Sequence, residues 1–264
     1  MIFENDPPTL TSTELYTQDF YGIFESVKLL QAMRGALETH SSSEDSQVAI
    51  LCLTIFSELA RPLFSSIAPA ELHAIISTLI AHISNPQVVK EGLKALSEMI
   101  LAGNDQFSIA LVQFGVLHTL SAALVIYTAS DHRDWDICLR ACIVFYGLVE
   151  QPPVFEYMLD DSQITLDHWA NLIKYVSSCI PLENVTLVDM ARKSLQNISV
   201  LSKAQSLQGA FLQCGYSDCV RAVVLALGTF ADDPVCALCC CAVRFFWNTR
   251  GGRGLLLRRG EAMH

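Results

Sequence analysis

Four cysteines near the end of the chain are the residues whose spacing comes nearest to a site for chemistry. They lie within one apolar stretch, at Cys236, Cys239, Cys240 and Cys241. Structural zinc is usually held by two separated pairs of Cys or His ligands, and no second pair follows here at a suitable spacing. Cysteine in an apolar helix packs as a small hydrophobic residue. We therefore interpret the cluster as core and expect no metal.

The remaining candidate groups form no catalytic constellation. The histidines fit no HExxH-type motif, and they occur at His40, His73, His82, His118, His132, His168 and His264. The sequence also has no phosphate-binding loop, no dinucleotide fingerprint and no nucleophile elbow. A catalytic site needs several groups in complementary roles. We therefore predict that the protein is not an enzyme and uses no cofactor.

Composition restricts the class of partner. The 264 residues are 52% hydrophobic and 17% charged, which favours a folded chain over a disordered one. The net charge of −10 disfavours binding to nucleic acid phosphates and to anionic membrane surfaces. The N-terminus, MIFENDPPTL, has no signal-peptide pattern, and the cysteines lie on apolar helical faces. We expect a cytoplasmic or nucleocytoplasmic protein whose partners are other proteins.

One uncharged segment is long enough to be considered as a membrane span. Residues 107–129 contain no Asp, Glu, Lys or Arg, and their length would cross a bilayer. However, Gly115 divides the segment, and Gln113 and His118 place polar groups within it. We expect two short buried helices that meet at the glycine, and no membrane span.

The elements that would position any site are revealed by a repeating pattern. A small residue is followed four positions later by a large apolar one, at Cys52 and Phe56, Gly92 and Leu96, Ala141 and Phe145, Ala191 and Leu195, and Ala242 and Phe246. The large members are 40, 49, 50 and 51 positions apart. A helical repeat of this length is typical of an α-solenoid.

Prolines and glycines divide the chain into predicted helices. Asn85-Pro86 and Asp233-Pro234 each read as an N-cap followed by a proline in the first turn. Gly115 and Gly215 are each expected to turn the chain between two helices. The predicted helices are 17–39, 46–61, 69–84, 86–102, 105–114, 116–129, 134–150, 153–160, 163–179, 184–202, 204–214, 216–229 and 234–249.

The last helix of each repeat carries a resemblance to a known family. These segments read CLTIFSE, GLKALSE, ACIVFYG, ARKSLQN and AVRFFWN, and together they resemble the armadillo repeat. The resemblance implies an all-α fold, a right-handed α-solenoid of armadillo-like three-helix repeats with a HEAT-like N-terminal unit over 69–102. It would form one domain over 1–250 with about five repeats. Its third helices would lie near 46–61, 86–102, 134–150, 184–202 and 234–249, and 251–264 would be a flexible basic tail.

In armadillo proteins that bind extended peptides, the third helices line a concave groove. An asparagine on each helix clamps the peptide backbone, and a tryptophan one turn earlier packs on its side chains. The asparagine position is occupied here by Glu58, Glu98, Gly147, Asn197 and Asn248. The tryptophan position is occupied by Thr54, Lys94, Ile143, Lys193 and Arg244. The absence of this ladder argues against recognition of basic nuclear-localisation peptides.

The substitutions predict a different protein-binding site. Its candidate residues are Glu58, Lys94, Glu98, Lys193, Asn197, Arg244, Trp247 and Asn248. Acidic residues in the first half and basic ones in the second would orient a bound segment. Alternatively, these are ordinary solvated helix positions. Trp247 is either an interface anchor or a core residue.

The sequence leaves two functions open. The first is a non-enzymatic interaction scaffold or adaptor that binds a protein segment along the concave third-helix surface. The alternative is a structural or regulatory subunit of a larger multi-protein complex. The basic tail over 251–264 would either contact RNA or an acidic partner, or be an unstructured terminus.

Overall fold

The computed structural model describes residues 27–40, 46–61, 64–129, 131, 133–180, 188–214 and 216–229, and their regular elements are all helical. The all-α prediction is therefore confirmed for these residues. The first helix covers 27–40. It is followed by α2 (Gln47–Leu59), η1 (Phe64–Ser66), α3 (Pro69–Ala81), α4 (Pro86–Ala102), α5 (Asp105–Gln113), α6 (Val116–Tyr127), α7 (Trp135–Val149), α8 (Pro152–Asp160), α9 (Leu166–Ser178), α10 (Val188–Leu201), η2 (Gln205–Leu207), α11 (Gln208–Gln213) and α12 (Tyr216–Thr229). The predicted helix 234–249, residues 17–26 and the 251–264 tail lie outside the described residues.

Side-chain caps fix where several of the helices begin. The Asn85 side chain accepts hydrogen bonds from the backbone N–H groups of Gln87 and Val88, and Pro86 is the first residue of α4. Asp134 caps α7 in the same way, through the N–H groups of Asp136 and Ile137. These caps satisfy N–H groups that have no partner inside the helix. They confirm that the Asn85-Pro86 pair begins a helix.

The corner between α5 and α6 requires a glycine. Gly115 has a φ of 87°, in the left-handed region that side chains disfavour, and the two helices meet there at 66°. The next repeat has no glycine at its corner, and α8 and α9 are joined instead by residues 161–165. Gly215 lies outside the described residues.

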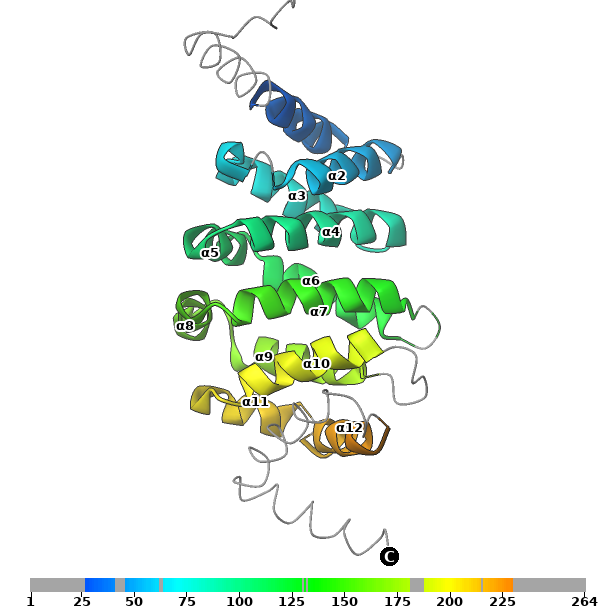
Figure 1. Ribbon diagram of the computed structural model, residues 1–264, viewed down its shortest axis with the longest axis vertical. Coiled ribbons are helices and arrows are strands. Elements are labelled where there is room, and N and C mark those ends of the chain that lie inside the picture. Colours follow the sequence, from blue (N-terminus) through cyan, green and yellow to red (C-terminus); the bar gives the residue numbers. More distant parts are fainter. Residues whose placement is uncertain are drawn as a thin grey trace, which may run out of the picture.

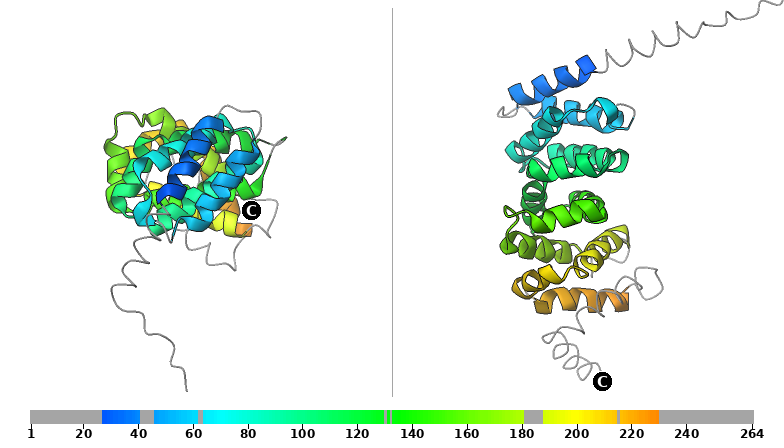
Figure 2. Two further views of the ribbon diagram at one scale, coloured as in Figure 1. Left: turned by 90° about the horizontal axis from the view of Figure 1, so that it is seen from above. Right: turned by 90° about the vertical axis from the view of Figure 1, so that its left-hand side faces the viewer.

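Helices that the sequence pattern predicts to be equivalent pack against one another. The third-helix layer consists of α2, α4, α7 and α10, which contact each other in that order (Figure 1). The second-helix layer consists of α3, α6, α9 and α12, which also contact each other in order. The helices follow one another along the long axis of the molecule (Figure 2). Equivalent positions of neighbouring repeats are thereby brought next to each other.

The small and large members of the repeating pairs are buried in this stack. Phe56, Leu96, Phe145 and Leu195 are all fully buried, and Gly92 shows why the first member must be small. A Cβ atom on Gly92 would lie 2.2 Å from Leu79 Cδ2, because α3 approaches α4 at this point. The fifth pair, Ala242 and Phe246, lies outside the described residues.

Among the described residues, no single helix combines the length and the apolar character needed to cross a membrane. Two sharply bent pairs, α5 with α6 and α7 with α8, meet those criteria only when their helices are taken together.

Candidate protein-binding face

The third-helix face is the exposed side of α2, α4, α7 and α10, and three of these helices carry the described members of the predicted site. Glu58 lies on α2, Lys94 and Glu98 lie on α4, and Lys193 and Asn197 lie on α10. The other three predicted residues, Arg244, Trp247 and Asn248, lie outside the described part of the chain. The face is therefore built here from four adjacent helices.

Two ion pairs join α4 to α2 and to Arg61, which lies just after the end of α2. Lys94 Nζ lies 2.7 Å from Glu58 Oε1, and Arg61 Nε lies 2.6 Å from Glu98 Oε2. The hydrogen bond from Lys94, followed by its positive charge, lowers the pKa of the Glu58 carboxyl. The predicted acidic half of the face is therefore balanced by bases from the neighbouring helix. The expected charge difference between its two ends is correspondingly smaller.

Lys90 makes the corresponding link from α4 to α7. Its ammonium lies 3.2 Å from Asp134 Oδ2 and 3.5 Å from Asp136 Oδ2. Asp136 also accepts a hydrogen bond from Arg140 Nε at 3.1 Å. The sequence prediction did not include Lys90, Asp134 or Asp136, because it considered only the asparagine and tryptophan positions of each helix. The spacing of Lys90, four residues before Lys94, would have placed it on the same side of the helix.

Lys193 and Tyr146 connect α7 to α10. The ammonium of Lys193 lies 4.6 Å from the centroid of the Tyr146 ring, within the range of a cation–π contact. The Tyr146 hydroxyl donates a hydrogen bond to Glu150 Oε1 at 2.9 Å. Burial, followed by this bond and the charge of Glu150, raises the pKa of Tyr146. Tyr146 is an aromatic residue on the face that the sequence prediction did not include.

Asn197 is placed differently from what the sequence indicated. It was expected to face a ligand, but its side chain is fully buried. Its Nδ2 donates to the carbonyl oxygens of Cys142 at 2.9 Å and Lys193 at 3.0 Å. Its Oδ1 has no hydrogen-bond partner among the described residues. The packing of α10 against α7 thus uses this amide to join the two helices.

Gly147 occupies the asparagine position of α7 and is covered by the preceding helix. A Cβ atom at this position would lie 2.8 Å from Ile100 Cγ2 on α4. The close approach of Ile100 explains why this position holds a glycine. The space between α4 and α7 is filled by the protein itself at this point.

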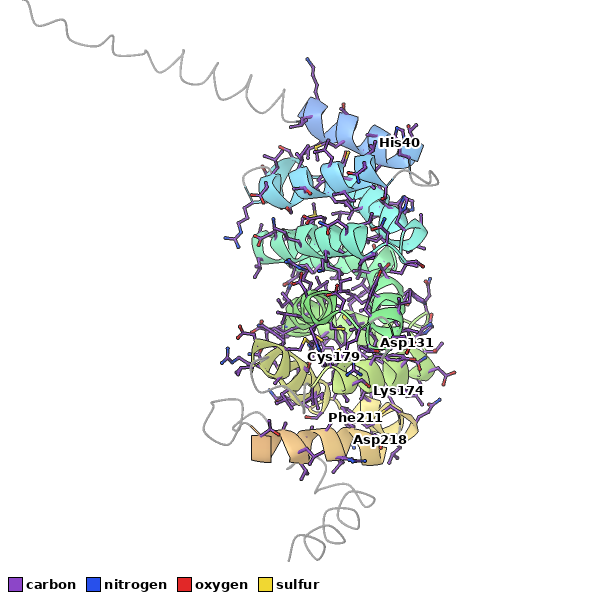
Figure 3. All side chains as sticks on the ribbon, turned by 90° about the vertical axis from the view of Figure 1, so that its right-hand side faces the viewer. His40, Asp131, Lys174, Cys179, Phe211 and Asp218 are labelled. Carbon is purple, nitrogen blue, oxygen red and sulfur yellow. The ribbon has the colours of Figure 1, made fainter. Side chains whose placement is uncertain are left out.

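Two clefts lie at the surface of the part of the chain that the structure describes. A cleft of about 540 Å³ between α9, α11 and α12 is lined by Asp167, Ala170, Asn171, Lys174, Gln213, Cys214 and Asp218. Figure 3 labels Lys174 and Asp218 on neighbouring helices at this end of the stack. A second cleft, of about 580 Å³, lies between the end of α6 and the start of α7, and its lining includes Tyr127, Arg133 and Asp134.

The described cysteines are free thiols, and most are held in the core. Burial raises the pKa of Cys219 to about 12 and that of Cys214 to about 11, so both stay protonated near neutral pH. Within the described ranges, no three His, Cys, Asp or Glu residues are grouped so that they could hold a metal ion. The Cys236–Cys241 cluster lies outside those ranges.

Comparison with known proteins identifies no relative by sequence. No family model and no curated protein matches the chain. A crystal structure of an engineered protein from the Northeast Structural Genomics Consortium is similar over 81% of this chain and 96% of its own. The two are 13% identical, with a TM-score of 0.43, a likeness too distant to bear on function.

Proposed function

We propose that this protein is a non-enzymatic interaction scaffold of armadillo-like architecture, a right-handed α-solenoid with a HEAT-like unit at α3 and α4. Its third-helix face would bind a segment of a partner protein in the cytoplasm or nucleocytoplasm. The observation that carries the proposal is the unbroken third-helix layer, in which four helices from successive repeats present one shared face. Stacked repeats of this kind provide extended surfaces for partners.

The part of the face over α7 and α10 is the best candidate for the energetic centre of binding. Ile143 and Tyr146 are half-buried on α7, and Lys193 approaches from α10. Aromatic and apolar anchors at the middle of an interface supply most of its binding energy. By contrast, the exposed ion pairs between α2 and α4 are already satisfied, and exposed pairs contribute little. We assign them to the rim.

Asn197 supports this site without contacting the partner. Its buried amide fixes α10 against α7 through the Cys142 carbonyl, which holds Lys193 beside Tyr146. The proposed contact set therefore consists of Ile143, Tyr146 and Lys193, with Glu58, Lys94 and Glu98 at its edge. Arg244, Trp247 and Asn248 remain candidates for extending the same face.

Site-specific photo-crosslinking tests the assignment. A benzophenone amino acid would replace Ile143 on the third-helix face in one variant and Val125 on the second-helix layer in another, each in the full chain expressed in cells. We expect a discrete crosslinked protein from position 143 and none of that mass from position 125. Equal crosslinking at both positions, or none at 143, would place binding elsewhere.

The alternative function, a subunit of a larger complex, has one observation in its favour. Ile80, Val125 and Leu225 are 52%, 42% and 41% exposed on α3, α6 and α12, three helices of the second-helix layer. Apolar side chains repeated along one layer suit a permanent contact with another subunit. Light scattering separates the functions, because a monomer favours the scaffold, whereas self-association that Val125→Asp and Leu225→Asp abolish favours the subunit.

A further inference from the structure

Two histidines meet at the contact between α6 and α9. The rings of His118 and His168 are 4.5 Å apart between centroids, with an interplanar angle of 70°. They border a cavity of about 10 Å³ whose other lining residues are Leu117, Ser121, Ile164 and Leu172. This volume is at the lower limit for one water molecule. The cavity therefore has mainly apolar walls and little room for solvent, while His118 is also exposed at the surface and His168 is half-buried.

His168 also takes part in the N-terminal cap of α9. The backbone N–H of Thr165 donates to His168 Nδ1 at 3.2 Å, and the Thr165 hydroxyl lies 2.9 Å from the same nitrogen. His168 thus occupies the place of the Glu or Gln in a capping box. Nδ1 can accept only when it carries no proton. An imidazolium ion has two donors and no acceptor, so protonation of Nδ1 removes the acceptor for Thr165.

No carboxylate lines the cavity between the two rings. The charged and titratable groups of the helices that pack against α6 have other contacts or positions. On α3, Glu71 accepts from the Ala68 N–H and His73 stacks on Phe114. On α7, Asp136 pairs with both Lys90 and Arg140, and on α5 Asp105 lies in the first turn. On the helices that pack against α9, Asp189 pairs with Arg192, Lys193 lies over Tyr146, and Arg221 is exposed. Asp167 of α9 accepts from Gln213 of α11, and Lys174 and Asp218 line the cleft beyond them. A positive charge on the pair is therefore not offset by an acid in the cavity.

We propose that His118 and His168 form an acid-sensitive joint between α6 and α9. Protonation withdraws the cap acceptor from Thr165 and places two like charges at the contact between these helices. The packing of α9 on α6 then loosens. Because α6 and α9 belong to successive repeats, the joint couples pH to the stiffness of the stack.

The direction of the pH effect follows from the environment of His118. Burial, followed by the charge of His168, lowers the pKa of His118. In the unfolded chain the same group titrates near the ordinary value of about 6.5. The unfolded chain therefore binds more protons in the window just below that value. The stabilising contribution is present above about pH 6.5 and is lost as the pH falls through it.

Native-state hydrogen exchange on the full chain tests the joint. The wild type would be compared at about pH 7.5 and about pH 5.5 with a His118→Phe/His168→Gln variant. Phenylalanine keeps an aromatic ring at the contact, and glutamine accepts the cap hydrogen bond without titrating in this range. His73→Phe, which removes a histidine that stacks on Phe114 instead, is the matched control.

After correction for intrinsic exchange, we expect wild-type protection in the first two turns of α9 to fall roughly threefold to tenfold, the effect of losing one hydrogen bond at the cap. The control should show the same fall, and the double variant should show none. Equal pH responses in the wild type and the double variant would overturn the proposal. An NMR titration of the wild type is independent of the variants. A His118 imidazole that becomes protonated at or above its ordinary pKa would overturn the proposal on its own.

Discussion

The ammonium of Lys193 lies 4.6 Å from the centroid of the Tyr146 ring and thereby joins α10 to α7. It is the last of a series of contacts that cross the third-helix layer. Lys94 joins α4 to α2 through Glu58, and Lys90 joins α7 to α4 through Asp134 and Asp136. The charged side chains of this face are thus largely engaged with one another. A partner would gain most from the apolar and aromatic surface between them.

Replacement of Gly92 by alanine should destabilise the protein. The added methyl would overlap both Leu79 Cδ2 and Leu79 Cγ, at 2.2 and 2.7 Å, and the branching carbon cannot move away without shifting the side chain. Overpacking of this kind costs about 1–3 kcal/mol in unfolding free energy. Gly35→Ala is the control, because a Cβ there meets nothing within 4 Å. A Gly92→Ala variant as stable as Gly35→Ala would contradict the close packing of α3 on α4.

Alanine at position 197 should lower stability even without a partner present. It removes the donor to the Cys142 carbonyl between α10 and α7, and an unsatisfied buried group costs about 1–3 kcal/mol. Asn197→Asp should cost more, since a buried carboxylate would face the Cys142 and Lys193 carbonyl oxygens. Urea unfolding measures both changes. If Asn197→Ala weakens only partner binding and leaves unfolding unchanged, Asn197 is a ligand clamp and not a packing residue.

The Glu58 carboxyl should titrate below its ordinary range. The Lys94 hydrogen bond and charge favour the ionised form, so the stabilising contribution is present above the unfolded pKa and is lost as the pH falls through the lowered folded pKa. Carbon-detected NMR titration of Glu58 measures this directly. In Lys94→Met the pKa should return toward the ordinary value. Lys90→Met serves as the control, because Lys90 pairs with Asp134 and Asp136 instead.

Substitution of Glu71 should destabilise the protein, because its buried carboxylate caps the start of α3. Its carboxylate accepts from the Ala68 N–H at 3.0 Å and lies 3.6 Å from Arg34 Nη1, while its side chain is only 4% exposed. Glu71→Ala leaves both groups without this partner, and we expect a loss of about 1–3 kcal/mol in unfolding free energy. Glu71→Gln retains an acceptor for the cap and should lose less. If calorimetry shows that Glu71→Gln is less stable than Glu71→Ala, the capping role is refuted.

Local signals in the sequence were sufficient to predict most of the helices. Asn85 and Pro86 lie next to each other and cap the helix they precede, and Gly115 turns the chain within a single corner. The first residue of α9 was harder to predict. The predicted helix covered 163–179, whereas α9 begins at Leu166. His168 replaces the usual Glu or Gln of the capping box there, which hid the signal.

The contacts across the layer could not be predicted in the same way. Lys94 and Glu58 are 36 positions apart, and Asn197 and Cys142 are 55 apart. Only the stacking of successive third helices brings them together. The comparison of repeats identified Asn197 as equivalent to an exposed position, but the depth of each position depends on how closely the neighbouring helix packs. Tyr146 was missed for the same reason, because it acquires its role from Lys193 of the next helix.

The most direct measurement is the affinity for the partner captured at position 143, compared between two matched double variants. Tyr146→Ala/Lys193→Glu alters the third-helix face, and Tyr175→Ala/Lys174→Glu alters a similar pair on α9, where Lys174 lies 5.4 Å from the Tyr175 ring centroid. Loss of an anchor of this kind costs about 2 kcal/mol or more. We predict a loss of roughly thirtyfold or more for the first variant and less than about twofold for the second. Equal affinities for the two variants, with both folded, would contradict binding at the third-helix face.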